Sequence, residues 1–278
     1  SETADFLFGR KEIRTPRVRR KPLGKLEIKN ARENNLQNVD VEIPIGCLVG
    51  IAGVSGSGKS SLLRCLSGWI KPSSGSVEIN DKPVQEYSSS QRAEWIALLP
   101  QRVQLSENIS IKEWLGYARF RFTETQSKRR QKIRSLLHAQ GLETLSERSW
   151  AQLSGGEAQR CAMLALIAQE ARIWLLDEPA NHLDPKIQQN VYQGLISQWN
   201  TGTTMVLITH NINLLLRSVP DKYKHKVRIL GIHEGSIQFD SALGSPELAA
   251  QISKLYQLPV ETISAFGFSQ LIFGQGEK

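Results

Sequence analysis

The 278-residue sequence predicts an α/β fold, in which a mainly parallel sheet has an antiparallel flank at one end and a helical lobe inserted between its strands. Three continuous apolar runs, at residues 48–52, 173–176 and 205–208, have the length of buried strands. Apolar residues at helical spacing follow the first run, and others separate the second run from the third. Since strands that alternate with helices usually pair in parallel, these segments predict the core sheet.

The antiparallel flank is predicted from two segments near the N-terminus. Residues 25–29 and 39–43 alternate apolar and polar side chains, as half-buried strands do. Asn34 and Asn35 form a turn signal between them, and Pro-Ile-Gly at residues 44–46 forms another after the second segment. We therefore expect these strands at one end of the core.

A mostly helical stretch lies between the first strand unit and the second, at about residues 103–170. Within it Ile133, Leu136 and Leu137 recur at helical spacing, and Gly141 is placed where a helix commonly ends. We interpret this stretch as a helical lobe inserted into the α/β core.

The chain divides into a basic N-terminal tail, residues 1–24, and one domain, residues 25–278. The net charge is +8, and residues 1–29 hold nine Lys and Arg against four Asp and Glu. Prolines interrupt the basic run at residues 14–22, so it cannot form a regular helix. Such a segment could meet acidic lipid headgroups, nucleic acid or only water.

Several classes of protein are disfavoured by composition. No apolar stretch approaches the roughly 18 residues of a membrane-spanning helix. The N-terminal residues lack the apolar segment of a secretory signal, so we expect a cytoplasmic chain. Cys47, Cys65 and Cys161 stand far apart, which argues against a zinc site and against a disulfide framework.

A phosphate-binding pattern occupies residues 53–60, which read Gly-Val-Ser-Gly-Ser-Gly-Lys-Ser and fit G-x-x-x-x-G-K-[ST], the P-loop. The glycines let backbone N–H groups converge on phosphate oxygens, and the following helix adds its positive end. Lys59 supplies a cation for the β and γ phosphates, and Ser60 would ligate Mg²⁺. The sequence thus predicts a P-loop NTPase core that binds ATP and Mg²⁺ through Gly53, Ser55, Gly56, Ser57, Gly58, Lys59, Ser60 and Ser61.

Two carboxylates end the second apolar run, in the order Ile-Trp-Leu-Leu-Asp-Glu at residues 173–178. Asp177 can hold Mg²⁺ through water. Glu178 can orient and deprotonate a water molecule aimed at the γ-phosphorus. Combined with the P-loop, this pair predicts ATP hydrolysis.

Four further motifs make the family resemblance specific. Residues 153–160 read Leu-Ser-Gly-Gly-Glu-Ala-Gln-Arg, Gln101 follows Leu-Leu-Pro, residues 181–184 read Asn-His-Leu-Asp, and His210 follows Ile-Thr. They resemble, respectively, the signature, the Q-loop, the D-loop and the switch histidine of the ABC ATPases. Along the chain these motifs and the P-loop occur in the order that the family has. The resemblance implies that Gln101 reaches Mg²⁺ or the lytic water and that His210 contacts the γ-phosphate.

The signature also implies a partner. It opens a predicted helix, so it forms a second phosphate-binding N-terminus in a chain that holds one triphosphate. In the ABC ATPases this element completes the site of a partner subunit, so we expect a homodimer or a paired ABC ATPase. The residues expected to contact the partner's nucleotide are Ser154, Gly155 and Gly156, and Asp184 of the D-loop is also expected to bind nucleotide.

Two subfamilies of ABC protein resemble different parts of the chain. Residues from about 10 to 62 look like the second ATPase half of the DNA-repair excinuclease A subunit, whereas residues from about 66 to 275 resemble ATPase subunits of iron-siderophore, haem and cobalamin importers. The excinuclease resemblance would imply zinc-module cysteines and a larger insertion before the signature, which this sequence lacks. We therefore expect an importer ATPase, peripheral at the inner face of the cell membrane with permease partners, and keep a DNA-associated ATPase as the alternative.

The adenine contact departs from the family pattern. Many ABC ATPases stack an aromatic residue on adenine from the first strand region, but residues 32–36 read Arg-Glu-Asn-Asn-Leu. Arg32 could stack there instead, through a cation–π contact.

Overall fold

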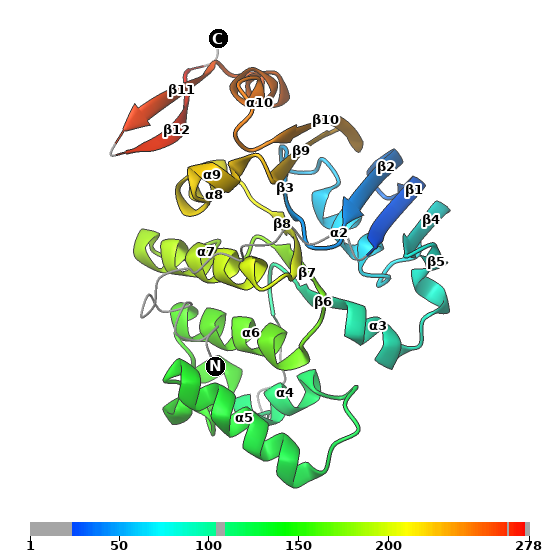
Figure 1. The fold of residues 1–278 in the computed structure, drawn as a ribbon, viewed down its shortest axis with the longest axis vertical. Helices are drawn as coiled ribbons and strands as arrows, with labels where there is room; N and C mark the ends of the chain where they lie inside the picture. The colour runs from blue at the N-terminus through cyan, green and yellow to red at the C-terminus, as the bar shows by residue number, and fades with distance from the viewer. Residues whose placement is uncertain (1–23, 104–108, 266, 276–278) are drawn as a thin grey trace.

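The computed structural model describes residues 24–103, 109–265 and 267–275 (Figure 1). Of the expected basic tail at residues 1–24, only Gly24 belongs to the described residues, so the interpretation of that tail stays a prediction.

A six-stranded sheet forms the centre of the chain, in the order β10-β9-β3-β8-β7-β6. Neighbours from β9 to β6 pair in parallel, and β10 pairs antiparallel to β9. The three predicted apolar runs are β3, β7 and β8, which confirms the mainly parallel α/β fold. The strands are β3 Leu48–Ala52, β6 Ile96–Leu99, β7 Ile173–Asp177, β8 Thr204–Ile208, β9 Val227–His233 and β10 Ser236–Ala242.

Two cores lie on opposite faces of this sheet, because successive strand residues point to opposite sides. On β8, Met205 and Leu207 pack into the core that also holds residues of α7 (Pro185–Asn200). Val206 and Ile208 of the same strand pack into the core that holds residues of α2 (Lys59–Leu66). Burial on both faces explains why these strands read as continuous apolar runs.

The antiparallel flank, predicted from two strands, is a four-stranded sheet in the order β2-β1-β4-β5, of which β4 and β5 were not predicted. Its strands pair antiparallel, and their inward side chains share the core of α2. The short helices α3 (Ser89–Trp95) and η1 (Val84–Glu86) connect it to β6. The strands are β1 Lys25–Glu33, β2 Leu36–Pro44, β4 Ser74–Ile79 and β5 Lys82–Pro83.

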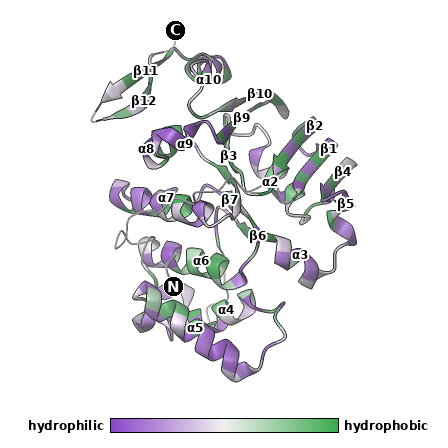
Figure 2. Cartoon of the chain, viewed as in Figure 1, coloured by the Kyte–Doolittle hydropathy of each residue, from purple (hydrophilic) through white to green (hydrophobic). Residues whose placement is uncertain are grey.

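The helical lobe lies between β6 and β7 and has an apolar cluster of its own, which includes Leu115, Ile133, Leu136 and Leu164. Gly141 caps α5 with φ 62°, as expected from the sequence. Figure 2 shows much of α5 in purple, the colour of hydrophilic residues, and most of its Lys and Arg residues are exposed. The helices are α4 Ile111–Ala118, α5 Gln126–Gln140, η2 Glu143–Leu145, η3 Trp150–Gln152 and α6 Gly155–Gln169.

The C-terminal part adds helices and a two-stranded sheet, which projects from the body at the top of Figure 1. We call β11 and β12 the C-terminal hairpin; it packs against α8. Strands β9 to β12 were not predicted from the sequence. The elements are α8 Ile212–Ser218, α9 Asp221–Lys224, α10 Leu248–Tyr256, β11 Val260–Ala265 and β12 Phe268–Phe273.

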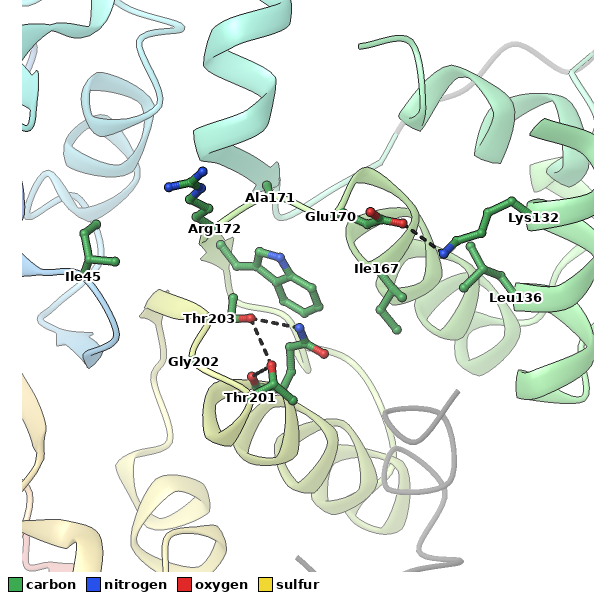
Figure 3. A pocket seen from close by; sticks show the side chains of 12 residues that line it. Ile45, Lys132, Leu136, Ile167, Glu170, Ala171, Arg172, Thr201, Gly202 and Thr203 are labelled. Carbon is green, nitrogen blue, oxygen red and sulfur yellow. Dashed lines mark hydrogen bonds and ion pairs between the residues drawn. The ribbon is translucent and has the colours of Figure 1, made fainter. Parts of the chain in front are cut away.

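A cavity of about 470 Å³ separates the lobe from the core at the end of the sheet away from the P-loop (Figure 3). Lys132 of α5 and Glu170 after α6 form an ion pair of 3.1 Å at its edge, and Thr203 lines it from the core side. None of the predicted site residues lines this cavity. Among the helices of the described residues, none combines the length and the hydrophobicity that a membrane span requires.

Candidate nucleotide site

The P-loop connects the end of β3 to the start of α2. Gly56 and Gly58 have φ values of 78° and 99°, which favour glycine, and a Cβ on Gly58 would also lie 3.0 Å from Leu36 Cδ2. Ser57 is buried, and Ser55 is exposed. Ser60 and Ser61 lie in the first turn of α2, so the helix N-terminus points at the loop as a phosphate site requires.

Lys59 is only 6% exposed and crosses the loop. Its Nζ donates hydrogen bonds to the carbonyl oxygens of Gly53 at 2.8 Å and Val54 at 2.7 Å. Burial lowers the pKa of Lys59, and the nearby carboxylates of Glu178 and Asp177 oppose that shift. A buried cation at the N-terminus of a helix is suited to a polyphosphate.

Asp177 is the last residue of β7 and is 5% exposed. Burial raises the pKa of its carboxyl, and a hydrogen bond with Ser60 acts in the opposite direction. Its Oδ1 is buried, and no described residue forms a hydrogen bond with it. An orphaned carboxylate oxygen beside a serine hydroxyl is the oxygen-rich donor set that Mg²⁺ prefers, so these residues fit the predicted metal.

Glu178 is the centre of a polar cluster. Gln101 Nε2 donates to Glu178 Oε2 at 3.0 Å, and Asn181 Nδ2 donates to the same oxygen at 2.6 Å. His210 Nε2 lies 2.5 Å from Glu178 Oε1. The structure therefore brings together the three residues expected to be catalytic, Glu178, Gln101 and His210.

These residues meet because each follows a neighbouring parallel strand. Gln101 comes after β6, Glu178 after β7 and His210 after β8, and the carboxyl ends of parallel strands share one edge of a sheet. Asn181 was missed as a contact of Glu178. Its only sequence signal was its place in the D-loop, three residues further on.

The signature residues lie at the N-terminus of α6. Ser154 is the N-cap: its hydroxyl accepts from the backbone N–H of Glu157, whose carboxylate accepts from Ser154 N at 2.8 Å. Gly155 lines a hollow of about 330 Å³ together with Gln101 and Glu178. Within the described part of the chain, no hydrogen bond or ion pair joins Ser154, Gly155 or Gly156 to the P-loop.

Asp184 caps the next helix. Its carboxylate accepts from the backbone N–H groups of Lys186 at 3.1 Å and Ile187 at 3.0 Å, which fixes the start of α7. Its expected contact with nucleotide stays a prediction.

The turn between β1 and β2, where the sequence suggested an adenine contact, lies against the P-loop. Asn35 Nδ2 donates to Gly56 O at 2.7 Å, which holds the turn against the loop. Arg32 is exposed, and its Nε donates to Asn38 Oδ1 at 2.5 Å. The stacking role suggested for Arg32 stays a prediction. In the structure its guanidinium is bonded to Asn38.

Comparison with known proteins agrees with this geometry. The family model described as ABC transporter matches residues 36–181, more than half of the chain. The chain belongs to the ABC transporter family. As an ABC ATPase domain it binds and hydrolyses ATP, and ABC ATPases dimerise and work with membrane permease components.

Relatives of the ABC ATPase cover most of its length. The Hemin import ATP-binding protein HmuV of Bordetella avium is 28% identical over 247 residues, which span 86% of this chain and 92% of the relative. The Ferric enterobactin transport ATP-binding protein FepC of Escherichia coli is 31% identical and spans 80% of this chain and 81% of the relative. The ATP-binding cassette MJ0796, solved as a dimer with ADP and Pi, has a TM-score of 0.69 and 26% identity and covers 78% of this chain and 98% of that one.

Proposed function

We propose that this chain is the ATPase subunit of an importer, with a cargo of the iron-siderophore, haem or cobalamin class. The observation that carries the proposal is its similarity, over 80% or more of its length, to HmuV and FepC, whose names give hemin and ferric enterobactin as cargo. The chain would act at the inner face of the cell membrane, as a peripheral partner of permease subunits.

The phosphate chain of ATP would lie along the P-loop, with Lys59 at the β and γ phosphates. Ser60, Asp177 and Gln101 are the residues that would hold Mg²⁺. The ion would supply positive charge at the phosphate oxygens.

Glu178 supplies the base in this scheme. Its carboxylate takes a proton from a water molecule while the water oxygen bonds to the γ-phosphorus and the bond to ADP breaks. Gln101 and Asn181 hold the carboxylate in place, and His210 would contact the γ-phosphate from the far side. The cluster around Glu178 supports the roles proposed for Glu178, Gln101 and Asn181, and the role proposed for His210 rests on the family resemblance.

The site of one chain is completed by the signature of another in this proposal. Ser154, Gly155 and Gly156 lie at a helix N-terminus, and Ser154 and Gly155 are exposed. The hydrogen bonds of Ser154 stay within the first turn of α6. This helix N-terminus can therefore contact the γ-phosphate bound to a second copy of the chain. We propose a homodimer.

The permease contact is proposed on the lobe, where exposed aromatic residues gather. Tyr117 of α4 is 63% exposed and Phe120 is 54% exposed. Ser90 Oγ donates to Arg121 O at 3.5 Å, which places α3 beside this segment. Large exposed aromatic side chains are typical of protein contacts.

The test combines membrane capture with a DNA assay. The tagged chain, expressed in its source cell, should retain a multispanning protein from detergent-solubilised membranes. A variant with Tyr117→Ser and Phe120→Ser should lose that protein but keep the basal ATPase rate. Retention by the variant would remove the lobe from the contact.

A DNA arm separates the alternative function. If residues 1–24 bind DNA, duplex DNA should bind with a steep salt dependence and removal of the tail should abolish binding. DNA binding tighter than the roughly micromolar range of nonspecific contacts, with ATP turnover that rises with DNA, would favour the excinuclease-like function. We expect neither.

A further inference from the structure

The C-terminal part of the chain reaches back to the P-loop. The backbone N–H of Gly53 donates a hydrogen bond of 3.2 Å to the hydroxyl oxygen of Tyr256, which lies 203 positions further along the chain. Tyr256 is the last residue of α10 and is partly buried. Burial raises the pKa of this hydroxyl, so it stays neutral under the conditions in which ATPases are assayed.

Gly53 is restrained from three directions. Its N–H bonds to Tyr256, and its carbonyl accepts from Lys59 Nζ at 2.8 Å. A Cβ at this position would lie 2.2 Å from the carbonyl oxygen of Ile232, so β9 closes the third side. The same residue therefore receives the tyrosine on one side and the phosphate-binding lysine on the other.

The C-terminal hairpin holds the ring of Tyr256. Phe273 of β12 meets that ring edge to face, with centroids 5.9 Å apart. Asn213 of α8 ties the hairpin down, since its side-chain amide donates to Leu271 O at 2.9 Å and accepts from Leu271 N at 2.8 Å. The helix α8 begins two residues after His210, so the hairpin connects the P-loop with the segment that carries the switch histidine.

We propose that Tyr256 is a positioning residue for the P-loop, and that the C-terminal hairpin holds it there. The inference rests on the proposed nucleotide site. Without the hydroxyl, the N–H of Gly53 loses its partner, the loop gains freedom, and Lys59 loses a fixed carbonyl from which to approach phosphate. Affinity for ATP should fall. The rate at which bound ATP is hydrolysed, kcat, should change little, because the hydroxyl of Tyr256 bonds to the phosphate-binding loop and not to Glu178.

Tyr256→Phe tests this, because it removes one oxygen and keeps the ring against Phe273. The Kd and KM for ATP should rise about three- to tenfold, which is the value of one hydrogen bond, with kcat within about twofold of wild type. Tyr87→Phe is the matched control: it removes a hydroxyl that donates to Ile79 O at 3.0 Å in the antiparallel flank. It should leave KM unchanged.

A second variant tests the hairpin. Asn213→Ala should raise KM by less than Tyr256→Phe, and the double variant should have the KM of Tyr256→Phe alone, because both act through one contact. An unchanged KM in Tyr256→Phe, or a loss of kcat at unchanged KM, overturns the proposal. Failure of the nucleotide site itself gives a different result, since Lys59→Ala would then bind ATP as well as wild type.

Discussion

Glu178→Gln is the substitution whose effect the structure defines most closely. The carboxylate accepts at Oε2 from Gln101 at 3.0 Å and Asn181 at 2.6 Å, and Oε1 lies 2.5 Å from His210 Nε2. An amide offers one acceptor oxygen and one NH₂ donor, so its oxygen can accept from only one of these two sets. The oxygen can remain with Gln101 and Asn181. The NH₂ group then faces His210, whose neutral ring can accept at that nitrogen in its other tautomer.

The expected magnitudes follow from this arrangement. The free energy of unfolding should fall by about 1.5–3 kcal/mol at most, which is the value of one hydrogen bond to a charged group. Turnover should fall by about 10²- to 10⁴-fold, because the amide cannot take the proton of water. That fall corresponds to about 3–5 kcal/mol of activation free energy.

Two measurements are needed. Phosphate release at saturating ATP gives the turnover, and a fluorescence titration gives the affinity for nucleotide. ATP affinity should stay near the wild-type value, since Lys59 and the P-loop are unchanged. The control is Glu94→Gln, which changes a surface carboxylate paired with Arg172 at 2.9 Å and should leave turnover unaffected. Turnover of Glu178→Gln close to that of the wild-type protein would refute the assignment of Glu178 as the base.

Two further predictions concern the P-loop and the metal residues. Lys59→Ala should weaken ATP binding about 10- to 100-fold, measured by the same titration, because the phosphates lose a buried cation; unchanged affinity would refute the P-loop assignment. Burial raises the pKa of Asp177 above its ordinary value of 3.8, so the folded chain binds that proton more tightly than the unfolded chain does. The stability of the fold therefore falls as the pH rises from 3.8 through the raised pKa. Asp177→Asn should therefore raise the Tm at neutral pH by about 2 °C while it abolishes ATP turnover, and a lower Tm in calorimetric melts would contradict this.

The central strands could be predicted because burial on both faces leaves a continuous apolar run. β6 was not recognised as a strand, since four residues ending in Leu98-Leu99 carry too little periodicity. β9 was also missed. It contains Arg228 and Gly231, and its burial comes from pairing with β3 and β10, which local sequence does not encode.

The candidate site shows the same division. Gln101, Glu178 and His210 could be named from motifs, and their meeting follows from parallel strand order. The contact of Asn181 with Glu178 depends on the turn after β7, where Glu178 has φ 52°, and such a backbone angle is not legible in the sequence. The contact of Tyr256 with Gly53 could not be predicted from the sequence. The two residues are 203 positions apart, and only the fold brings them together.

We expect the signature of one copy to complete the nucleotide site of another. The most direct measurement is the molar mass of Glu178→Gln by light scattering with ATP and Mg²⁺. The mass should rise from 31.1 kDa to twice that value, and should return to 31.1 kDa when Ser154→Arg is added to the same chain. A protein that binds ATP and still has a mass of 31.1 kDa, or a dimer indifferent to Ser154→Arg, would contradict it.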